Sequence, residues 1–132
     1  MSYLLDSHTF VWAHLDPLKL SANVLEILED EDNAIFLSYA SIWELRGKVK
    51  AGHLVFRDGL MATVYREMDR NNLHLLPVLR LHRKQFATLP FYMDHVDPYD
   101  RILAAQSVAE QMPLLTNDDK FRQFDYGLIT IW

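Results

Sequence analysis

The chain has 132 residues, no cysteine and a formal net charge of −5. This length fits one domain, residues 1–132, that buries a core without covalent staples. The lack of cysteine excludes disulfides and thiolate metal sites, so a bound metal must use oxygen or histidine ligands. The chain starts without a basic segment, and no stretch reaches the roughly 20 apolar residues of a membrane span. We therefore expect a soluble, cytoplasmic protein with no membrane partner.

The charge is unevenly distributed along the chain. Residues 1–45 carry eight acids and one base, residues 46–93 carry nine bases and three acids, and residues 94–132 carry seven acids and three bases. A basic middle segment between acidic ends indicates a phosphate-facing side, although solvated helix faces would give the same pattern.

Short apolar runs alternate with amphipathic segments. In chain order, the patterns predict a strand at 3–5, helices at 9–14 and 21–30, a strand at 34–37, helices at 40–50 (between Ser38 as N-cap and Gly52 as C-cap) and 58–71, a strand at 73–76, a helix at 81–89, a loop at 90–97, a helix at 98–110, a strand at 113–116, a polar turn at 117–121 and a strand at 128–131. This alternation predicts an α/β protein with a parallel, doubly wound sheet.

Acidic residues flank these strands at one end of the predicted sheet. Asp6 follows the first strand, and Asp118 and Asp119 follow the fourth. Glu44 lies in the helix after the second strand, and Asp100 lies in the first turn of the helix before the fourth. Open α/β sheets bind ligands beyond the carboxyl ends of their strands, so acids from four segments can converge there. Because clustered carboxylates repel one another, they favour a hard cation such as Mg²⁺ or Mn²⁺, which can promote attack of water on a phosphodiester.

Each acid also has a local explanation. Asp6 can cap a helix that begins at Ser7, and Asp118 can cap the following turn. Glu44 can pair with Lys48 four residues later, and the segment 97–100 (DPYD) is a good helix start in its own right. The metal-site prediction therefore depends on the joint placement of the acids.

The histidines and tryptophans give weaker signals. The six histidines share no metal-binding spacing, which argues against a zinc site, and His95 near Asp97 has the pattern of an ordinary loop residue. We expect Trp12, Trp43 and Trp132 in the core or at an interface. Stacking of Trp12 on a base remains an alternative, because this side chain lies close to Asp6 in the sequence.

Four segments, taken in order, resemble the motifs of PIN-domain proteins. They are residues 4–12 (LLDSHTFVW), 38–45 (SYASIWEL, with Lys48 and the segment 52–54 after it), 95–106 (HVDPYDRILAAQ) and 114–118 (LLTND). They extend over nearly the whole chain and are most similar to the VapC-type toxins of bacterial toxin–antitoxin pairs. The sequence departs from the family at Ser7 (often threonine), His53 (often lysine), Tyr99 (often phenylalanine) and Ala104 (often isoleucine), without loss of a carboxylate.

The resemblance implies a three-layer fold, with a central parallel sheet of about four or five strands flanked by helices. It implies Mg²⁺- or Mn²⁺-dependent endoribonuclease activity on an RNA such as tRNA. It also implies a homodimer and a small antitoxin that covers the site and inserts a basic side chain.

The resemblance further assigns metal-ligand or catalytic roles to four acids: Asp6, Glu44, Asp100 and Asp118. It implies that Thr116 orients a water or ligand and that Asp97 is a cap that supports Asp100. Asp119 is the less suitable member of the adjacent pair.

Two other classes of protein remain as alternatives. A phosphoacceptor signalling domain would need an aspartate after the middle strand, and the segment 73–77 offers none. A non-catalytic PIN-like binding module would not need the acids, all of which are present.

Overall fold

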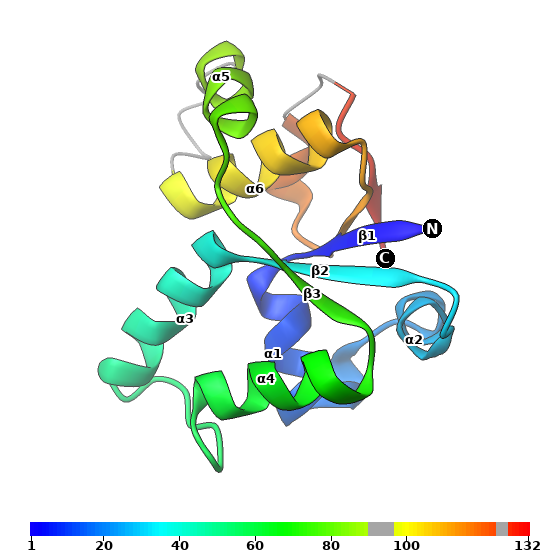
Figure 1. Cartoon of the computed structure of the whole chain (residues 1–132), viewed down its shortest axis with the longest axis vertical. Coiled ribbons are helices and arrows are strands. Elements are labelled where there is room, and N and C mark those ends of the chain that lie inside the picture. The colour runs from blue at the N-terminus through cyan, green and yellow to red at the C-terminus, as the bar shows by residue number, and fades with distance from the viewer. Residues whose placement is uncertain (90–96, 124–126) are drawn as a thin grey trace.

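The computed structural model describes residues 1–89, 97–123 and 127–132. In these residues a parallel sheet of five strands has the order β3-β2-β1-β4-β5 (Figure 1). The strands are β1 (Ser2–Leu5), β2 (Ala34–Ser38), β3 (Leu73–Leu76), β4 (Leu114–Leu115) and β5 (Thr130–Ile131). The predicted α/β class and parallel sheet are confirmed. Since the chain builds one half of the sheet outward from β1 and then the other half, its topological switch point lies between β1 and β4.

Helices cover both faces of the sheet, which gives the predicted three layers (Figure 1). One layer holds α1 (Ser7–Leu15), α2 (Ala22–Glu29), α3 (Tyr39–Lys50) and α4 (Leu60–Arg70), and the other holds α5 (Arg80–Thr88) and α6 (Pro98–Glu110). None of the helices in the described ranges has the length and apolar content that a membrane span requires.

The alternation of side chains along β1 explains the two cores. Tyr3 and Leu5 face the layer of α1–α4, where Phe10 and Val64 are fully buried. Leu4 faces the opposite layer with Leu103 of α6. Both faces of a central parallel strand are covered, so its sequence is a continuous apolar run.

Most predicted elements are confirmed, with shifts at their ends. The helix expected at 9–14 begins at Ser7, and the strands expected at 113–116 and 128–131 shorten to the two residues of β4 and β5. The turn expected at 117–121 is a short 3₁₀ helix, η2 (Asp119–Gln123), and a second one, η1 (Pro17–Lys19), was not predicted. The loop expected at 90–97 lies outside the described residues except for its last position, as does His95.

Local signals explain the ends of α3. The Ser38 hydroxyl accepts a hydrogen bond from the N–H of Ala40 (3.0 Å), as expected of an N-cap. Gly52 follows the helix with a φ of +80°, a conformation that glycine adopts without strain. These ends place Glu44 in the N-terminal half of α3, near the carboxyl end of β2.

Candidate metal centre

Asp6 lies at the carboxyl end of the central strand, at the switch point between β1 and β4. Its backbone N–H donates to the carbonyl of Leu115 (3.1 Å), which also accepts from the Thr9 hydroxyl (2.7 Å). Asp6 occupies the N-cap position of α1, but its side chain makes no capping bond. The carboxylate is directed to β4 instead, where Oδ2 accepts a 2.7 Å hydrogen bond from the hydroxyl of Thr116.

The Thr116 hydroxyl joins two of the predicted acids. It donates to Asp6 and accepts a 3.1 Å hydrogen bond from the backbone N–H of Asp118. The Asp118 carboxylate is half-buried, and its Oδ1 accepts from the N–H of Lys120 (3.0 Å), so the expected capping of the turn is observed. Asp119 is exposed and pairs with Arg122 (3.4 Å). Thr116 therefore holds the Asp6 carboxylate in one orientation and connects it to the segment that carries Asp118.

Three further carboxylates gather from α3 and the start of α6. Oxygen atoms of Glu44, Asp97 and Asp100 lie within 4.8 Å of one another. We call these three residues the acid group. In the described part of the chain, Glu44 forms no ion pair with Lys48, so the surface salt bridge considered above is absent. The acid group is therefore a concentration of like charge that favours a cation.

Asp97 contributes to the site in two ways. Its Oδ1 accepts hydrogen bonds from the N–H groups of Tyr99 (2.8 Å) and Asp100 (3.3 Å), so the predicted cap of α6 is observed. Its carboxylate is also part of the acid group, a position that the sequence pattern alone does not indicate. The signal in the sequence was ambiguous, because a helix start that begins with aspartate fully accounts for this residue.

Burial raises the pKa of the Asp6 carboxyl, which is only 2% exposed. The hydrogen bond from Thr116 and the charge of His8 lower that pKa in part, whereas the charge of Glu44 raises it. The negative charge of Glu44, a member of the acid group, therefore acts on the Asp6 carboxyl. A bound cation would reverse the sign of the local field and stabilise the ionised carboxylate.

The donor set fits a hard divalent cation. All of the groups that converge are carboxylates, and such oxygen ligands suit Mg²⁺ and Mn²⁺. Two buried hydroxyls lie close in sequence to these acids: Ser7 follows Asp6, and Ser41 lies one turn before Glu44. Neither has a hydrogen-bond partner among the described residues.

The family model of the PIN domain matches residues 3–126. The chain belongs to the PIN-domain family. The resemblance inferred from the four motifs is therefore confirmed, together with the three-layer fold that it implied.

Solved structures with this fold include proteins of toxin–antitoxin pairs. A chain of VapBC2 from Rickettsia felis, bound to a promoter DNA fragment, superposes with a TM-score of 0.73 at 21% identity, over 99% of this PIN domain and 98% of that chain. VapBC-5 from Mycobacterium tuberculosis gives 0.62 at 23% identity, over 98% of each chain. FitAcB from Neisseria gonorrhoeae gives 0.60 at 20% identity, over 98% and 97%. No curated protein matches the sequence. These TM-scores over nearly the full length of each chain establish a shared fold.

The order of the strands changes the argument against a phosphoacceptor signalling domain. We took the third strand in the chain as the middle of the sheet, but β3 is an edge strand and the central strand is β1, which is followed by Asp6. An aspartate therefore does stand where such a domain would need one. Membership of the PIN-domain family, and not the lack of an aspartate, argues against a signalling domain.

The aromatic residues near the site divide into packed and exposed side chains. Trp12 contacts Trp132 edge to face (5.7 Å between ring centroids) and lies below Lys19, so the expected packing of these two tryptophans is observed. Trp43, beside Glu44 on α3, is 47% exposed and so does not lie in the core, and a place at an interface stays a prediction. No pattern in the sequence separates Trp43 from the packed tryptophans.

We predict that Thr116→Val destabilises the protein at neutral pH by about 1.5–3 kcal/mol, the usual contribution of a hydrogen bond to a charged group. Valine removes the bond that lowers the pKa of Asp6, so this pKa rises further. The loss should shrink as the pH falls below the pKa of Asp6 in the folded protein, because the protonated carboxyl needs the bond less. Urea denaturation at several pH values tests this, with Thr116→Ser as the control that keeps the hydroxyl. A loss independent of pH would show that Thr116 acts only by packing.

Proposed function

We propose that this PIN domain is an endoribonuclease that hydrolyses RNA phosphodiester bonds with Mg²⁺ or Mn²⁺. The observation that carries the proposal is the convergence of Glu44, Asp97 and Asp100, together with the charge of Glu44 that acts on the buried Asp6 at the switch point of the sheet. Open α/β sheets bind their ligands at this point, and the charge of the site suits a cation with a phosphate.

The proposed roles of the residues follow from their positions. Asp6, Glu44 and Asp100 hold the cation with their carboxylates, and Asp118 completes the ligand set from the end of β4. Thr116 holds the orientation of Asp6 through its 2.7 Å hydrogen bond. When bound, the metal ion supplies positive charge that draws in a phosphate oxygen, lowers the pKa of a water and stabilises the leaving oxygen. Asp97 holds the first turn of α6, and hence Asp100, in place.

We further propose that the protein is the toxin of a toxin–antitoxin pair, acts in the cytoplasm as a homodimer, and is inhibited by a small antitoxin. The similarity to VapBC-5, described as a member of the VapBC family of toxin–antitoxin systems, supports this proposal. A basic side chain of the antitoxin would complement the acid group. A small reading frame with a DNA-binding segment, directly upstream of the gene, would support the pairing; its absence would count against it.

The activity should depend wholly on a divalent cation. We expect cleavage of a labelled RNA in Mg²⁺ or Mn²⁺, and a drop to the background rate, by at least about 100-fold, when EDTA removes the metal. Calorimetric titration of Mg²⁺ into the protein without RNA should show binding, since the ligands come from the protein. Cleavage that persists in EDTA would contradict the proposal. Failure to bind metal would indicate the non-catalytic PIN-like module instead.

A further inference from the structure

The positive charge of the basic segment, residues 46–93, is not evenly spread over its helices. Residues 57–70 carry three bases and three acids, and Arg66 pairs with Asp58 at 2.9 Å. The excess of positive charge therefore lies on two helices only: the second half of α3, with Arg46, Lys48 and Lys50, and α5, with three cations and no acid. α3 carries Glu44, and α5 packs on α6, which carries Asp100.

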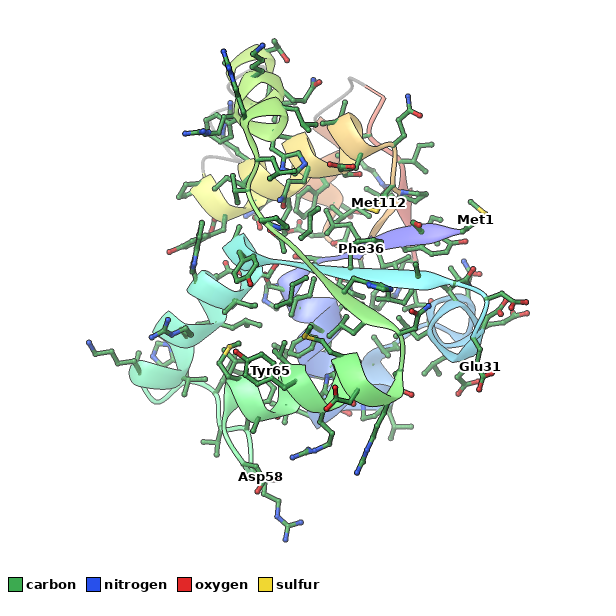
Figure 2. The ribbon with its side chains drawn as sticks, viewed as in Figure 1. Met1, Glu31, Phe36, Asp58, Tyr65 and Met112 are labelled. Atoms are coloured by element: carbon green, nitrogen blue, oxygen red, sulfur yellow. The ribbon has the colours of Figure 1, made fainter. Side chains whose placement is uncertain are left out.

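The cations of α5 lie on its solvent side. Arg80, Arg83 and Lys84 are all exposed, and within the described ranges none of them takes part in an ion pair. Their spacing of three and four residues places them on one side of the helix. Figure 2 shows nitrogen-tipped side chains that project from α5 away from the sheet. We call these three residues the cationic face of α5.

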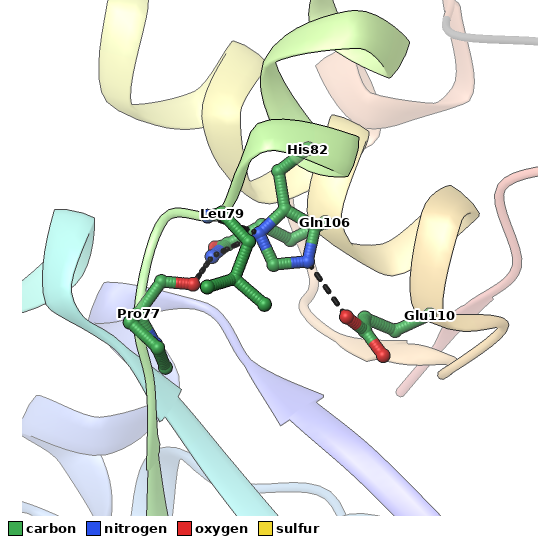
Figure 3. Close-up of polar contacts among 5 residues, drawn as sticks. All are labelled: Pro77, Leu79, His82, Gln106 and Glu110. Atoms are coloured by element: carbon green, nitrogen blue, oxygen red, sulfur yellow. Dashed lines mark hydrogen bonds and ion pairs between the residues drawn. The ribbon is translucent and has the colours of Figure 1, made fainter.

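Polar contacts hold α5 against its neighbours (Figure 3). His82, which is 1% exposed, contacts Glu110 of α6 through Nε2 (2.8 Å) and accepts from the N–H of Leu79 through Nδ1 (2.9 Å). Gln106 of α6 donates to the carbonyl of Pro77 just before the helix (3.2 Å). The cationic face is thus presented by a helix with a defined position.

The C-terminal end of α5 contacts the first turns of α6, the helix that carries Asp100. Arg101, the residue after Asp100, donates through Nη2 to the carbonyl of Leu89 (3.3 Å), and its guanidinium lies over the ring of Phe86 (5.1 Å to the centroid). At 1.5 Å of rise per residue, Arg83 and Lys84 are only about 8–9 Å along the helix axis from Leu89. A polyanion bound at the acid group through a cation would therefore have further phosphates within reach of α5.

We propose that the cationic face of α5 binds phosphates of the RNA strand that flank the phosphate held at the acid group. This inference rests on the proposed ribonuclease function. A protein with a net charge of −5 needs a local source of attraction for RNA. Cations of α5 that form no ion pair with any described residue provide one. The cations of α3 lie on the helix of Glu44, so the two helices give the strand a path across the site.

The test compares two double variants that each remove two positive charges. Arg83→Gln/Lys84→Gln alters the cationic face. Arg57→Gln/Arg70→Gln is the control: it removes two exposed cations near the ends of α4, on the opposite face of the sheet, that pair with no acid in the described ranges. Asp58, next to Arg57, lies far from α5 in Figure 2. Binding of a fluorescent single-stranded RNA is measured by fluorescence anisotropy over a series of salt concentrations. EDTA is present throughout and prevents metal-dependent cleavage.

We expect the α5 variant to bind RNA roughly 10- to 30-fold more weakly near 0.1 M salt, with a salt dependence reduced by about 1.4 in log–log slope. The control variant should match the wild type in both quantities. In Mg²⁺, the α5 variant should show a raised KM with an unchanged kcat for RNA cleavage, because these cations do not touch the reacting phosphate.

Two outcomes would overturn the inference. Equal weakening by both double variants would mean that only net charge matters. Unchanged RNA affinity together with a changed mass by light scattering would identify α5 as an interface with a second copy, a role that the exposed Leu81 would suit. The proposed function is judged separately: RNA binding through α5 without cleavage in Mg²⁺ would refute the nuclease activity and leave the binding face standing.

Discussion

We expect Asp6→Asn to reduce the proposed RNA cleavage by roughly 1,000-fold or more and to leave the fold intact. Asparagine matches aspartate in size and still accepts the hydrogen bond from Thr116, so the junction of β1 and β4 is preserved. It removes the negative charge that, in the proposed function, binds a cation at the switch point. Single-turnover cleavage rates and relief of growth arrest in cells measure the effect. A variant that cuts RNA as fast as the wild type would show that Asp6 is not part of the site.

The same substitution should stabilise the metal-free protein at neutral pH. Burial raises the pKa of Asp6, so the contribution of this residue to stability is fully present below its pKa in the unfolded chain and is lost as the pH rises through its higher pKa in the folded state. Asparagine cannot ionise and should remove this part of the pH dependence. Urea denaturation in EDTA between pH 4 and pH 8 should therefore show the two proteins diverging as the pH increases.

Metal ions should reverse this order of stability. A ligand that binds only the folded state stabilises it by about 2.7 kcal/mol at 100 times its dissociation constant, so Mg²⁺ should raise the stability of the wild type and leave Asp6→Asn nearly unchanged. An equal gain in both proteins would place the metal elsewhere.

Asp100→Asn and Asp97→Asn should differ in their effects although the two residues share one turn. We expect Asp100→Asn to lower the cleavage rate by about 100- to 1,000-fold, because a metal ligand is lost. Asp97→Asn should lower it by about 10-fold, since asparagine is as good an N-cap as aspartate and only the added negative charge disappears. Cleavage rates at saturating Mg²⁺ and Mg²⁺ affinities measure both variants.

Asp97→Ala is the control for the cap. It should reduce activity further than Asp97→Asn and destabilise the protein by about 1 kcal/mol, because the N–H groups of Tyr99 and Asp100 lose their acceptor. If Asp97→Asn is instead as inactive as Asp100→Asn, the Asp97 carboxylate is itself a metal ligand, which its position in the acid group allows.

The order of strands and helices could be predicted because each strand of this sheet is a short apolar run. Both faces of β1 and β2 are covered, so their sequences are continuous enough to stand out from the amphipathic helices. The nearness of Glu44 and Asp100 followed from the rule that parallel strands place their carboxyl ends on one edge. The order of the strands within the sheet did not follow, and β3 was wrongly placed in its middle.

Contacts between distant residues explain what the sequence could not provide. Nothing near His82 indicates that its ring meets Glu110, 28 residues later, and the ion pair of Arg66 with Asp58 depends on how the chain enters α4. The sequence alone therefore did not distinguish the three cations of α5 from the other bases of a 48-residue basic segment, part of which is neutralised by its own acids. The added role of Asp97 was hidden because capping already accounted for its position.

The hydrogen bond between Asp6 and Thr116 joins residues that are 110 positions apart. During translation the N-terminal parts of a chain emerge and begin to fold first. The strand β1 can then acquire its neighbour β2 early, but β4 and the hydroxyl that orients Asp6 arrive only after most of the chain has been made. For the ribonuclease proposed above, this timing implies that the nascent chain lacks the complete site until late in its synthesis, and that the proposed antitoxin has this interval in which to bind.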